Sequence, residues 1–155
     1  MTQPVDVRRG TAADTAFVYE LGRRIAATSA PAGRDVSLDA VRLGFERLVG
    51  YVFSQSYLLL IAHDAERPLG FLLLLDSMPD EVTLAPQAFV AYMAVEPGAQ
   101  RRGIGRALFG AAEDEARARG LPAIALMVTE SNLAARGLYD AVGLSTERRL
   151  MSKTL

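Results

Sequence analysis

A glycine-bearing turn in the second half of the chain carries the pattern that most directly suggests chemistry. A strand-like run ends at Val95 and continues through Gln100-Arg-Arg-Gly-Ile-Gly-Arg106 into a long helical pattern. Backbone N–H groups in the first turn of a helix have no intrahelical partner and carry the positive end of the helix dipole. With no side chains at Gly103 and Gly105, such a turn can wrap a pyrophosphate. Three arginines could add charge-assisted contacts: Arg101, Arg102 and Arg106.

Taken alone, the pattern Gln100-x-x-Gly103-x-Gly105 is weak, because the two glycines could simply allow a tight connection between a strand and a helix. A dinucleotide-binding turn of Rossmann type would need a third glycine at the position occupied by Leu108, and the acidic residue expected after the next strand is also absent. Only the segment that follows can therefore distinguish an anion-binding turn from a simple connection between a strand and a helix.

That following segment contains a second group of candidate residues. An apolar run precedes Asn132, which is followed seven residues later by Tyr139 and then by Gly143-Leu144. A phenol with an ordinary pKa of about 10 is a candidate hydrogen-bond or proton donor. The structural alternative is that Tyr139 is a packing residue of a short helix and that Asn132 is an ordinary helix cap.

The elements that position these residues follow from hydrophobic spacing and turn chemistry. Thr11 with Asp14 forms a potential capping box, and Ser37 is a potential cap of the next helix. In chain order we expect a strand at Val5–Arg9, a helix at Ala12–Ala27, a helix from Ser37 to Gly50, a hairpin of Tyr57–Ala62 and Leu69–Leu75, a strand at Ala88–Val95, a helix from Ile104 to Gly120 and a strand at Ile124–Val128.

Composition limits the class of protein. The 155 residues fit one domain spanning residues 1–155, and half of them are apolar, which is enough for a core without disulfides or metal. The absence of cysteine and the single histidine, His63, argue against a metal site. A net charge of −1 without a basic stripe argues against nucleic acid. No apolar run is long enough for a signal sequence or a membrane span, so we expect no membrane association and a cytoplasmic location.

With both motifs in place, the chain resembles the GNAT superfamily of N-acetyltransferases. The resemblance rests on the turn Gln100–Arg106 after a strand ending in Met93-Ala94-Val95, and on Asn132 and Tyr139 at the expected separation. It extends over essentially the whole chain. The usual Gly-Phe that closes the second motif is Gly143-Leu144 here, an apolar replacement of similar volume.

The resemblance implies a fold and a reaction. The fold would be α/β (α+β), with a mixed, mostly antiparallel sheet of six to seven strands, splayed between the fourth and fifth strands and flanked by about four helices. The cosubstrate would be acetyl-CoA, without a metal, and the product would be an acetylated amine of an acceptor that the sequence does not identify. The residues implied to bind acetyl-CoA are Met93, Ala94, Val95, Gln100, Arg101, Arg102, Gly103, Ile104, Gly105, Arg106, Asn132 and Tyr139. Tyr139 would also be the catalytic acid.

The general base is not evident. Some members of the superfamily carry a glutamate on the fourth or fifth strand, where this chain has Phe89 and Met127. An ordered water chain is the preferred substitute; its outer ends could be carboxylates such as Asp76, Asp80, Glu81 or Glu130. The alternative function is a catalytically idle CoA-binding or regulatory domain of the same fold. A homodimer is compatible with the sequence, which does not specify the oligomeric state.

Overall fold

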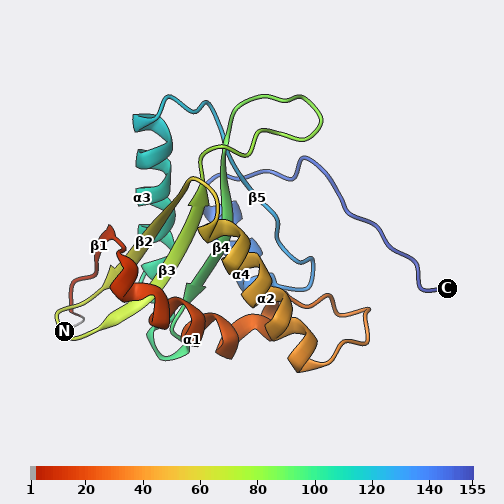
Figure 1. The fold of residues 1–155 in the computed structure, drawn as a ribbon, viewed down its shortest axis with the longest axis horizontal. Helices are drawn as coiled ribbons and strands as arrows, with labels where there is room; N and C mark the ends of the chain where they lie inside the picture. Colours follow the sequence, from red (N-terminus) through yellow and green to blue (C-terminus); the bar gives the residue numbers. More distant parts are fainter. Residues whose placement is uncertain (1–2) are drawn as a thin grey trace.

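A mixed sheet forms the centre of the molecule in the computed structural model, which describes residues 3–155; Met1 and Thr2, the first residues of the expected domain, lie outside the described part. The strands follow one another in the sheet in chain order, and every neighbouring pair is antiparallel except the parallel pair β4 and β5. The strands are β1 (Asp6–Arg9), β2 (Tyr57–His63), β3 (Pro68–Leu75), β4 (Ala88–Val95) and β5 (Ile124–Leu126). The expected mixed and mostly antiparallel architecture is confirmed (Figure 1).

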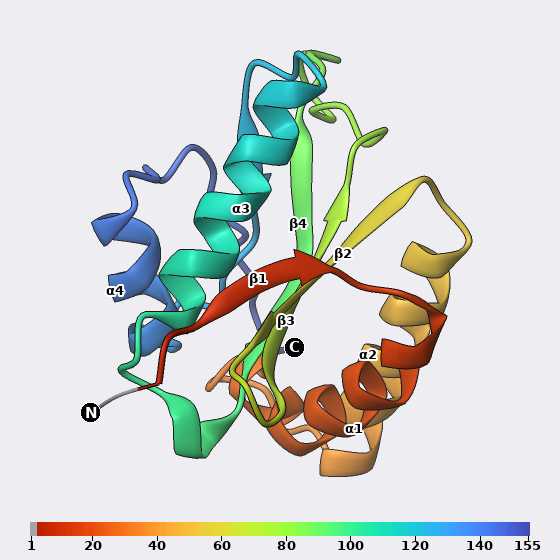
Figure 2. The same ribbon diagram turned by 90° about the vertical axis from the view of Figure 1, so that its left-hand side faces the viewer.

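Helices cover both faces of this sheet. Figure 2 shows α1 and α2 on one face and α3 with α4 on the other. The α-helices are α1 (Thr15–Ile25), α2 (Leu38–Phe53), α3 (Ile104–Ala118) and α4 (Leu133–Ala141), and the short 3-10 turns are η1 (Ala12–Asp14), η2 (Ala26–Ser29) and η3 (Pro97–Ala99). The expected complement of about four helices is therefore present in residues 3–155.

The sheet separates two apolar cores, and alternate residues of β2 and β3 contribute to each of them. Leu58 and Leu60 face the core beneath α3, whereas Leu59 and Ile61 face the core beneath α1 and α2. Successive side chains of a strand point to opposite faces, so a nearly continuous apolar run such as this one supplies both cores at once.

Local caps fix the helix starts on the α1 and α2 side. The Thr11 side chain accepts a hydrogen bond from the Ala13 N–H, and the Asp14 carboxylate accepts one from the Thr11 N–H, which confirms the capping box. Asp14 also accepts two hydrogen bonds from the Arg8 guanidinium at 2.9 and 2.8 Å, so β1 is tied to the start of the first helix. The Ser37 hydroxyl accepts from the Ala40 N–H at 3.1 Å, as expected.

The end of α2 differs from the sequence expectation. Gly50 was expected to end this helix, but the helix continues to Phe53. Val49 and Val52 are fully buried against the sheet, and this tertiary packing outweighs the low helix propensity of one exposed glycine, which costs about 1 kcal/mol.

The sheet opens between β4 and β5. Their pairing is limited to Ala88–Val90 on β4 and Ile124–Leu126 on β5, so β4 runs on to Val95 without a partner on that side. The expected splay is thus confirmed. β4 also carries a bulge opposite β3: Leu73 pairs with Tyr92 and Leu74 with Val90, which leaves Ala91 as the extra residue. A bulge turns consecutive side chains to one face. Ala91 and Tyr92 accordingly both pack on the α1 and α2 side.

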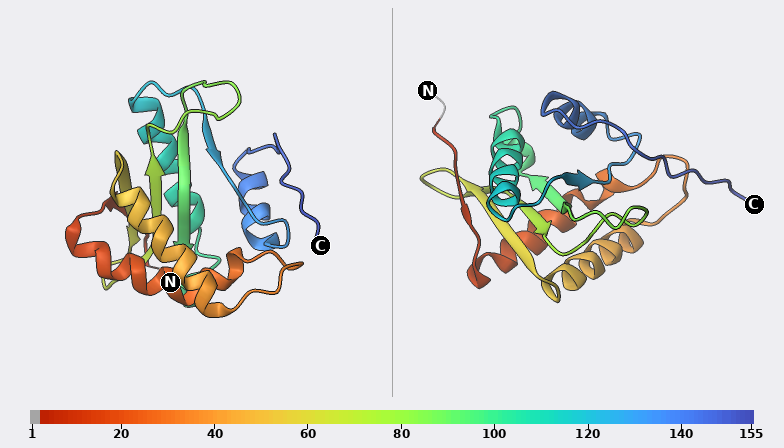
Figure 3. Two further views of the ribbon diagram at one scale, coloured as in Figure 1. Left: turned by 45° about the vertical axis from the view of Figure 1, so that its right-hand side comes forward. Right: turned by 90° about the horizontal axis from the view of Figure 1, so that it is seen from above.

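The strand count is lower than expected. The described residues form five strands instead of six or seven, because residues 145–155 are extended but pair with no strand. Figures 1 and 3 show this C-terminal tail leaving the body of the molecule beyond α4. None of the helices in residues 3–155 combines the length and apolar character that a membrane crossing requires.

Candidate functional site

A cleft of about 230 Å³ lies where β4 and β5 part. Its walls come from η2, α2, β4, β5, the segment after β5, and α4. The lining residues are Thr28, Ser29, Leu48, Val90, Ala91, Tyr92, Met93, Leu126, Met127, Val128, Thr129, Asn132, Ala135 and Tyr139. The Thr129 hydroxyl donates to the Ser29 carbonyl oxygen at 2.7 Å, which joins the two sides of the cleft.

The open edge of β4 presents backbone donors to this cleft. The N–H of Glu96 donates to the Leu69 carbonyl on β3 at 2.8 Å. Backbone groups of a strand alternate between its two edges, so the N–H groups of Val95 and Met93 point to the opposite edge, where β5 is no longer paired. These two donors can bind an extended amide-containing chain or an oxyanion.

The chain leads from this edge directly to the start of α3. Gly103 is the N-terminal cap of α3 with φ of 76°, a left-handed conformation that glycine adopts without a Cβ penalty. No side chain caps this helix, and the N–H groups of Ile104, Gly105 and Arg106 have no hydrogen-bond partner within residues 3–155. Free donors at the positive end of a helix dipole form an anion site. Arg101 also has a positive φ, 65°, so the turn holds an unusual conformation on both sides of Arg102.

The three arginines of the turn differ in their surroundings. The Arg102 side chain is directed to the β2–β3 hairpin, where it pairs with the Asp64 carboxylate at 3.3 Å and donates to the Gln3 carbonyl at 3.2 Å. Arg101 and Arg106 are exposed and form no ion pair within the described chain. The structure therefore leaves Arg101 and Arg106 free for an anion and uses Arg102 to fix the turn to the hairpin.

Gly105 has a role that spacing alone did not reveal. A Cβ at this position would lie 2.7 Å from Cδ2 of Leu138 on α4 and 3.8 Å from Cε of Met93. The missing side chain lets α4 approach the first turn of α3. Gly105 is thus a packing position between two helices as well as a member of the turn.

Tyr139 lies on α4 and lines the cleft. Its ring contacts Phe109 on α3, with 6.2 Å between the ring centroids. Its hydroxyl forms no hydrogen bond within residues 3–155, and the only fully buried side-chain polar atom without a partner there is Nε of Arg102. The phenol oxygen therefore opens onto the cleft. Burial, with a smaller electrostatic contribution from Tyr92, raises the pKa of Tyr139 to about 12.

Asn132 occupies the position of a helix cap. Its Oδ1 accepts a hydrogen bond from the Ala135 N–H at 3.3 Å at the start of α4, while the residue also lines the cleft. The capping reading is confirmed, and Asn132 positions Tyr139 through the helix that it starts.

Tyr92 is a site residue that the sequence analysis missed. The bulge at Ala91 turns it toward α1 and α2, where it packs against Phe45 with a centroid distance of 4.9 Å. Tyr92 lines the cleft and also an adjoining apolar cavity of about 370 Å³. Burial raises the pKa of Tyr92 as well. A tyrosine within the otherwise non-polar strand β4 was the available signal in the sequence, but only the bulge assigns its side chain to this face.

Carboxylates are absent from both cavities within residues 3–155. The candidates named from the sequence lie elsewhere: Asp80 binds Arg148 at 2.7 Å, Asp76 lies 3.5 Å from Arg119, and Glu130 pairs with Arg136 at 3.1 Å with its side chain 93% exposed. Glu81 is an exposed residue of the β3–β4 connection, which lines neither cavity.

The two positions compared with the glutamate of relatives carry no carboxylate to the cleft. Phe89 is partly buried against the α1 and α2 core and lines neither cavity, whereas Met127 lines the cleft and is 74% exposed. His63 ends β2 and lines neither cavity. Within the described residues, no group of three or more histidine, cysteine or carboxylate side chains is placed to hold a metal ion.

A splayed mixed sheet, an open strand edge and an uncapped glycine helix start define the acetyltransferase class of the GNAT type. The model of the Acetyltransferase (GNAT) family matches residues 21–144, and the chain belongs to this family. No curated protein sequence matches the chain.

Solved structures of acetyltransferases share the fold. A proposed acetyl transferase from Pyrococcus furiosus is 23% identical, with a TM-score of 0.83 over 98% of this chain and 100% of that chain. A ribosomal-protein-alanine N-acetyltransferase from Brucella melitensis is 18% identical, with a TM-score of 0.70 over 97% and 99%. An aminoglycoside N-acetyltransferase solved with CoA is 16% identical, with a TM-score of 0.69 over 97% and 98%. At these identities the similarity concerns the fold.

Proposed function

We propose that the chain binds acetyl-CoA and transfers its acetyl group to an amine by direct attack on the thioester. The observation that carries this proposal is the continuity between the open edge of β4, with the N–H groups of Met93 and Val95, and the free N–H groups of Ile104 to Arg106 at the start of α3. Those two sets of donors suit the amide arm and the pyrophosphate of one CoA molecule.

The turn from Gln100 to Arg106 would hold the pyrophosphate. Backbone donors at Ile104, Gly105 and Arg106 supply the anion site, and the exposed Arg101 and Arg106 add positive charge. Arg102 contributes by holding the turn against Asp64. Ala94 is buried in the α1 and α2 core, and its backbone groups face β3, so it lies between the two donors of the open edge without binding there itself.

The bound thioester supplies an activated acetyl group: the amine nitrogen bonds to the carbonyl carbon, the carbon–sulfur bond breaks, and CoA leaves as a thiolate. An N–H group of the open β4 edge would stabilise the oxyanion that develops during attack. Tyr139 would donate a hydrogen bond to the sulfur. Full proton transfer from a phenol with a pKa of about 12 to a thiolate whose thiol has a pKa of about 8.5 is uphill by roughly 5 kcal/mol. The role proposed for Tyr139 is therefore hydrogen-bond donation, and solvent protonates the thiolate.

The amine proton would leave through water. Tyr92 and Tyr139 both have raised pKa values, so they stay neutral and are poor bases near neutral pH. With no carboxylate lining the described cavities, an ordered water chain in the cleft is the proposed proton path. The cytoplasmic location expected from the sequence stays a prediction.

Calorimetric titration and turnover assays test the proposal together. Acetyl-CoA should bind with one site per chain, and acetyl-pantetheine, which lacks the pyrophosphate, should bind much more weakly. Acetyl transfer to an amine should then be detectable by mass spectrometry. Binding of acetyl-CoA without transfer to any amine would support the idle CoA-binding alternative, and equal affinity for acetyl-pantetheine would refute the pyrophosphate site.

A further inference from the structure

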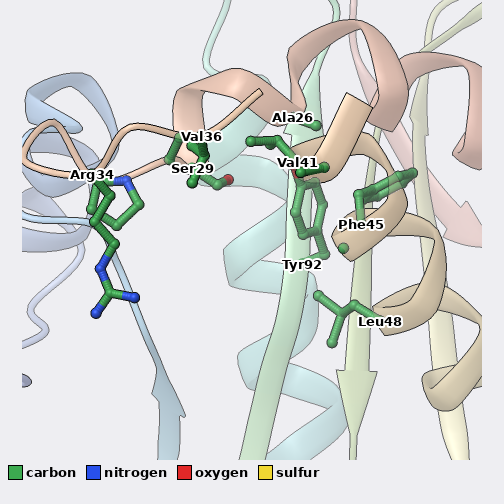
Figure 4. Close-up of a pocket in the computed structure, with 12 residues that line it drawn as sticks. Ala26, Ser29, Arg34, Val36, Val41, Phe45, Leu48 and Tyr92 are labelled. Carbon is green, nitrogen blue, oxygen red and sulfur yellow. The ribbon is translucent and has the colours of Figure 1, made fainter. Parts of the chain in front are cut away.

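An apolar cavity adjoins the cleft on the side of α2. It lies between the segment after η2 and helix α2, and it shares Ser29, Leu48 and Tyr92 with the cleft. Figure 4 shows Val36, Val41 and Phe45 grouped with Tyr92 around this space. A group bound here would therefore lie beside the open edge of β4.

The lining of this cavity is apolar except for Ser29, Arg34 and the hydroxyl-bearing Tyr92. Arg34 lies apart from the apolar group, with its guanidinium turned away from Tyr92 (Figure 4), and it forms no ion pair with any residue in 3–155. An unpaired cation and the absence of any carboxylate disfavour polyamines and aminoglycosides, because bound polycations need compensating negative charge. A molecule with an apolar group fits this cavity.

The lack of a base in the cavities adds a second constraint, on the amine itself. An amine must be neutral to attack, and a peptide α-amine with a pKa of 7.7 to 8.0 is roughly one-fifth to one-third neutral at pH 7.4. A lysine-type amine with a pKa of about 10.4 is neutral in only about one molecule in a thousand at that pH. Without a carboxylate to remove the proton, the neutral fraction of the α-amine exceeds that of the lysine-type amine by roughly 200- to 330-fold.

From these two constraints we infer that the acceptor is the amino terminus of a peptide or protein whose first side chain is apolar and occupies the cavity lined by Val41, Phe45 and Tyr92. The inference rests on the proposed acetyl transfer, whose site it deepens. In the reaction the terminal nitrogen bonds to the acetyl carbon, the carbon–sulfur bond breaks, and the nitrogen proton passes to water.

Gly44 offers a direct way to fill the cavity. It lies on the cavity side of α2, and a Cβ added there meets no atom within 4 Å. The leucine side chain of Gly44→Leu should therefore occupy the cavity without a clash. The helix should tolerate the substitution because leucine has a higher helix propensity than glycine. Gly50→Leu is the matched control, since Gly50 is an exposed glycine of the same helix, has the same open space, and lines neither cavity.

The experiment measures kcat/KM for acetylation of short lysine-free peptides that begin with Leu, Met, Phe, Gly or Asp. The comparison acceptors are an amino-terminally blocked peptide with one internal lysine, spermidine and neamine. We expect apolar first residues to exceed Gly and Asp by about 10- to 100-fold, the range for burying one such side chain. Gly44→Leu should remove this preference, whereas Gly50→Leu should keep it. Acetyl-CoA affinity should be unchanged in both.

The outcomes separate the two proposals. Absence of acetyl-CoA binding would refute the proposed function itself. If acetyl-CoA binds normally, three results would overturn the acceptor inference alone. These are transfer chiefly to spermidine, neamine or lysine, no transfer to any of the peptides, and a preference for apolar first residues that survives Gly44→Leu.

A separate observation concerns the C-terminal tail, residues 145–155. Leu150 is 83% exposed, Met151 is 87% exposed, and the segment pairs with no strand. One anchor, the ion pair between Arg148 and Asp80 at 2.7 Å, holds its first part. Beyond it the tail extends away from the body (Figures 1 and 3).

The outer edge of the sheet, along β5, also lacks a partner strand. β5 is the last strand of the sheet, so its far edge is unpaired, and all of its residues are only half-buried. Met127 and Leu133 beside it are 74% and 71% exposed, and α4 contains no fully buried residue. Exposed apolar edges promote pairing with another strand.

We propose that the tail of one copy pairs with the β5 edge of a second copy, and that a twofold dimer satisfies both tails and both edges. A self-complementary pair of surfaces on one chain produces a closed dimer of this type. Because Met127 and Val128 also line the cleft, the partner's tail would cover the outer wall of each site.

Sedimentation equilibrium on the full chain tests this second proposal. We expect the full chain to be a dimer at a protein concentration of roughly 100 µM, because a dimer with a micromolar dissociation constant is almost fully formed there. Removal of residues 150–155, which leaves the Arg148 anchor intact, should give a folded monomer, as should Met151→Asp. The control Lys153→Arg should stay dimeric. A monomeric full chain, including one whose tail folds back on its own β5, would refute the proposal, and so would a dimer that survives the truncation.

Discussion

Tyr139→Phe isolates the hydroxyl group that the proposed mechanism uses. The substitution keeps the ring and its 6.2 Å contact with Phe109, and it removes an oxygen that has no hydrogen-bond partner within residues 3–155. The free energy of unfolding and the affinity for acetyl-CoA should therefore stay within about 0.5 kcal/mol of wild type.

The expected catalytic loss follows from the surroundings of the phenol. Because the pKa of Tyr139 is raised to about 12, the hydroxyl donates a hydrogen bond without completing proton transfer. A hydrogen bond to a charged group is worth about 1.5 to 3 kcal/mol, which corresponds to roughly a 10- to 100-fold decrease in rate. Full general-acid catalysis would have been worth about 10²- to 10⁴-fold.

Single-turnover acetylation of a leucine-initiated peptide measures this loss in the chemical step. Tyr51→Phe, on the exposed side of α2, is the matched control and should react at the wild-type rate. The raised pKa also predicts no loss of rate from Tyr139 ionisation as the pH rises from 7 to 10, since the phenol stays protonated until the pH approaches its folded value. An unchanged single-turnover rate in Tyr139→Phe would refute the hydrogen-bond role. A lower melting temperature in the same preparation would instead indicate a packing role.

Three further predictions concern the turn and the first helix. Gly103→Ala should weaken acetyl-CoA binding and lower the free energy of unfolding by about 1 to 2 kcal/mol, because the φ of 76° at this position disfavours a Cβ although the space around it is open. Calorimetry measures the binding and thermal unfolding measures the stability, and Gly98→Ala is the control for both. Arg101→Ala should weaken acetyl-CoA binding more at low salt than at high salt, whereas Arg102→Ala should chiefly lower the melting temperature; the reverse pattern would contradict the assignment of the two arginines. Asp14→Asn should cost about 1 to 2 kcal/mol at pH 7, and since its ion pair lowers the folded pKa of Asp14, the difference from wild type should shrink in urea unfolding as the pH falls below about 4.

Local signals in the sequence predicted the elements that carry the site. The apolar run Ala88–Val95 matched β4 in position and length, the capping residues Thr11 and Ser37 marked the helix starts, and the turn Gln100–Arg106 led into α3 as expected. Each of these features depends on neighbours within a few residues, which is why sequence spacing was sufficient.

Long-range contacts were the part that spacing could not supply. The bulge at Ala91 depends on how β4 pairs with β3, and it alone brings Tyr92 to the junction of the cleft and the apolar cavity. The partner of Arg102 is 38 residues away in sequence, and the neighbour of Gly105 lies on another helix. The expected last strands are missing because residues 145–155 pair with no strand of the described chain, although the outer edge of β5 is unpaired.

Amide hydrogen exchange measured by NMR, with and without acetyl-CoA, tests the central claim most directly. We expect acetyl-CoA to slow exchange at Met93 and Val95 on the open edge of β4, and at Ile104, Gly105 and Arg106 in the first turn of α3. These N–H groups have no hydrogen-bond partner within residues 3–155. Protection at other amides, with these five unchanged, would show that acetyl-CoA does not bind in the split sheet and would contradict the account.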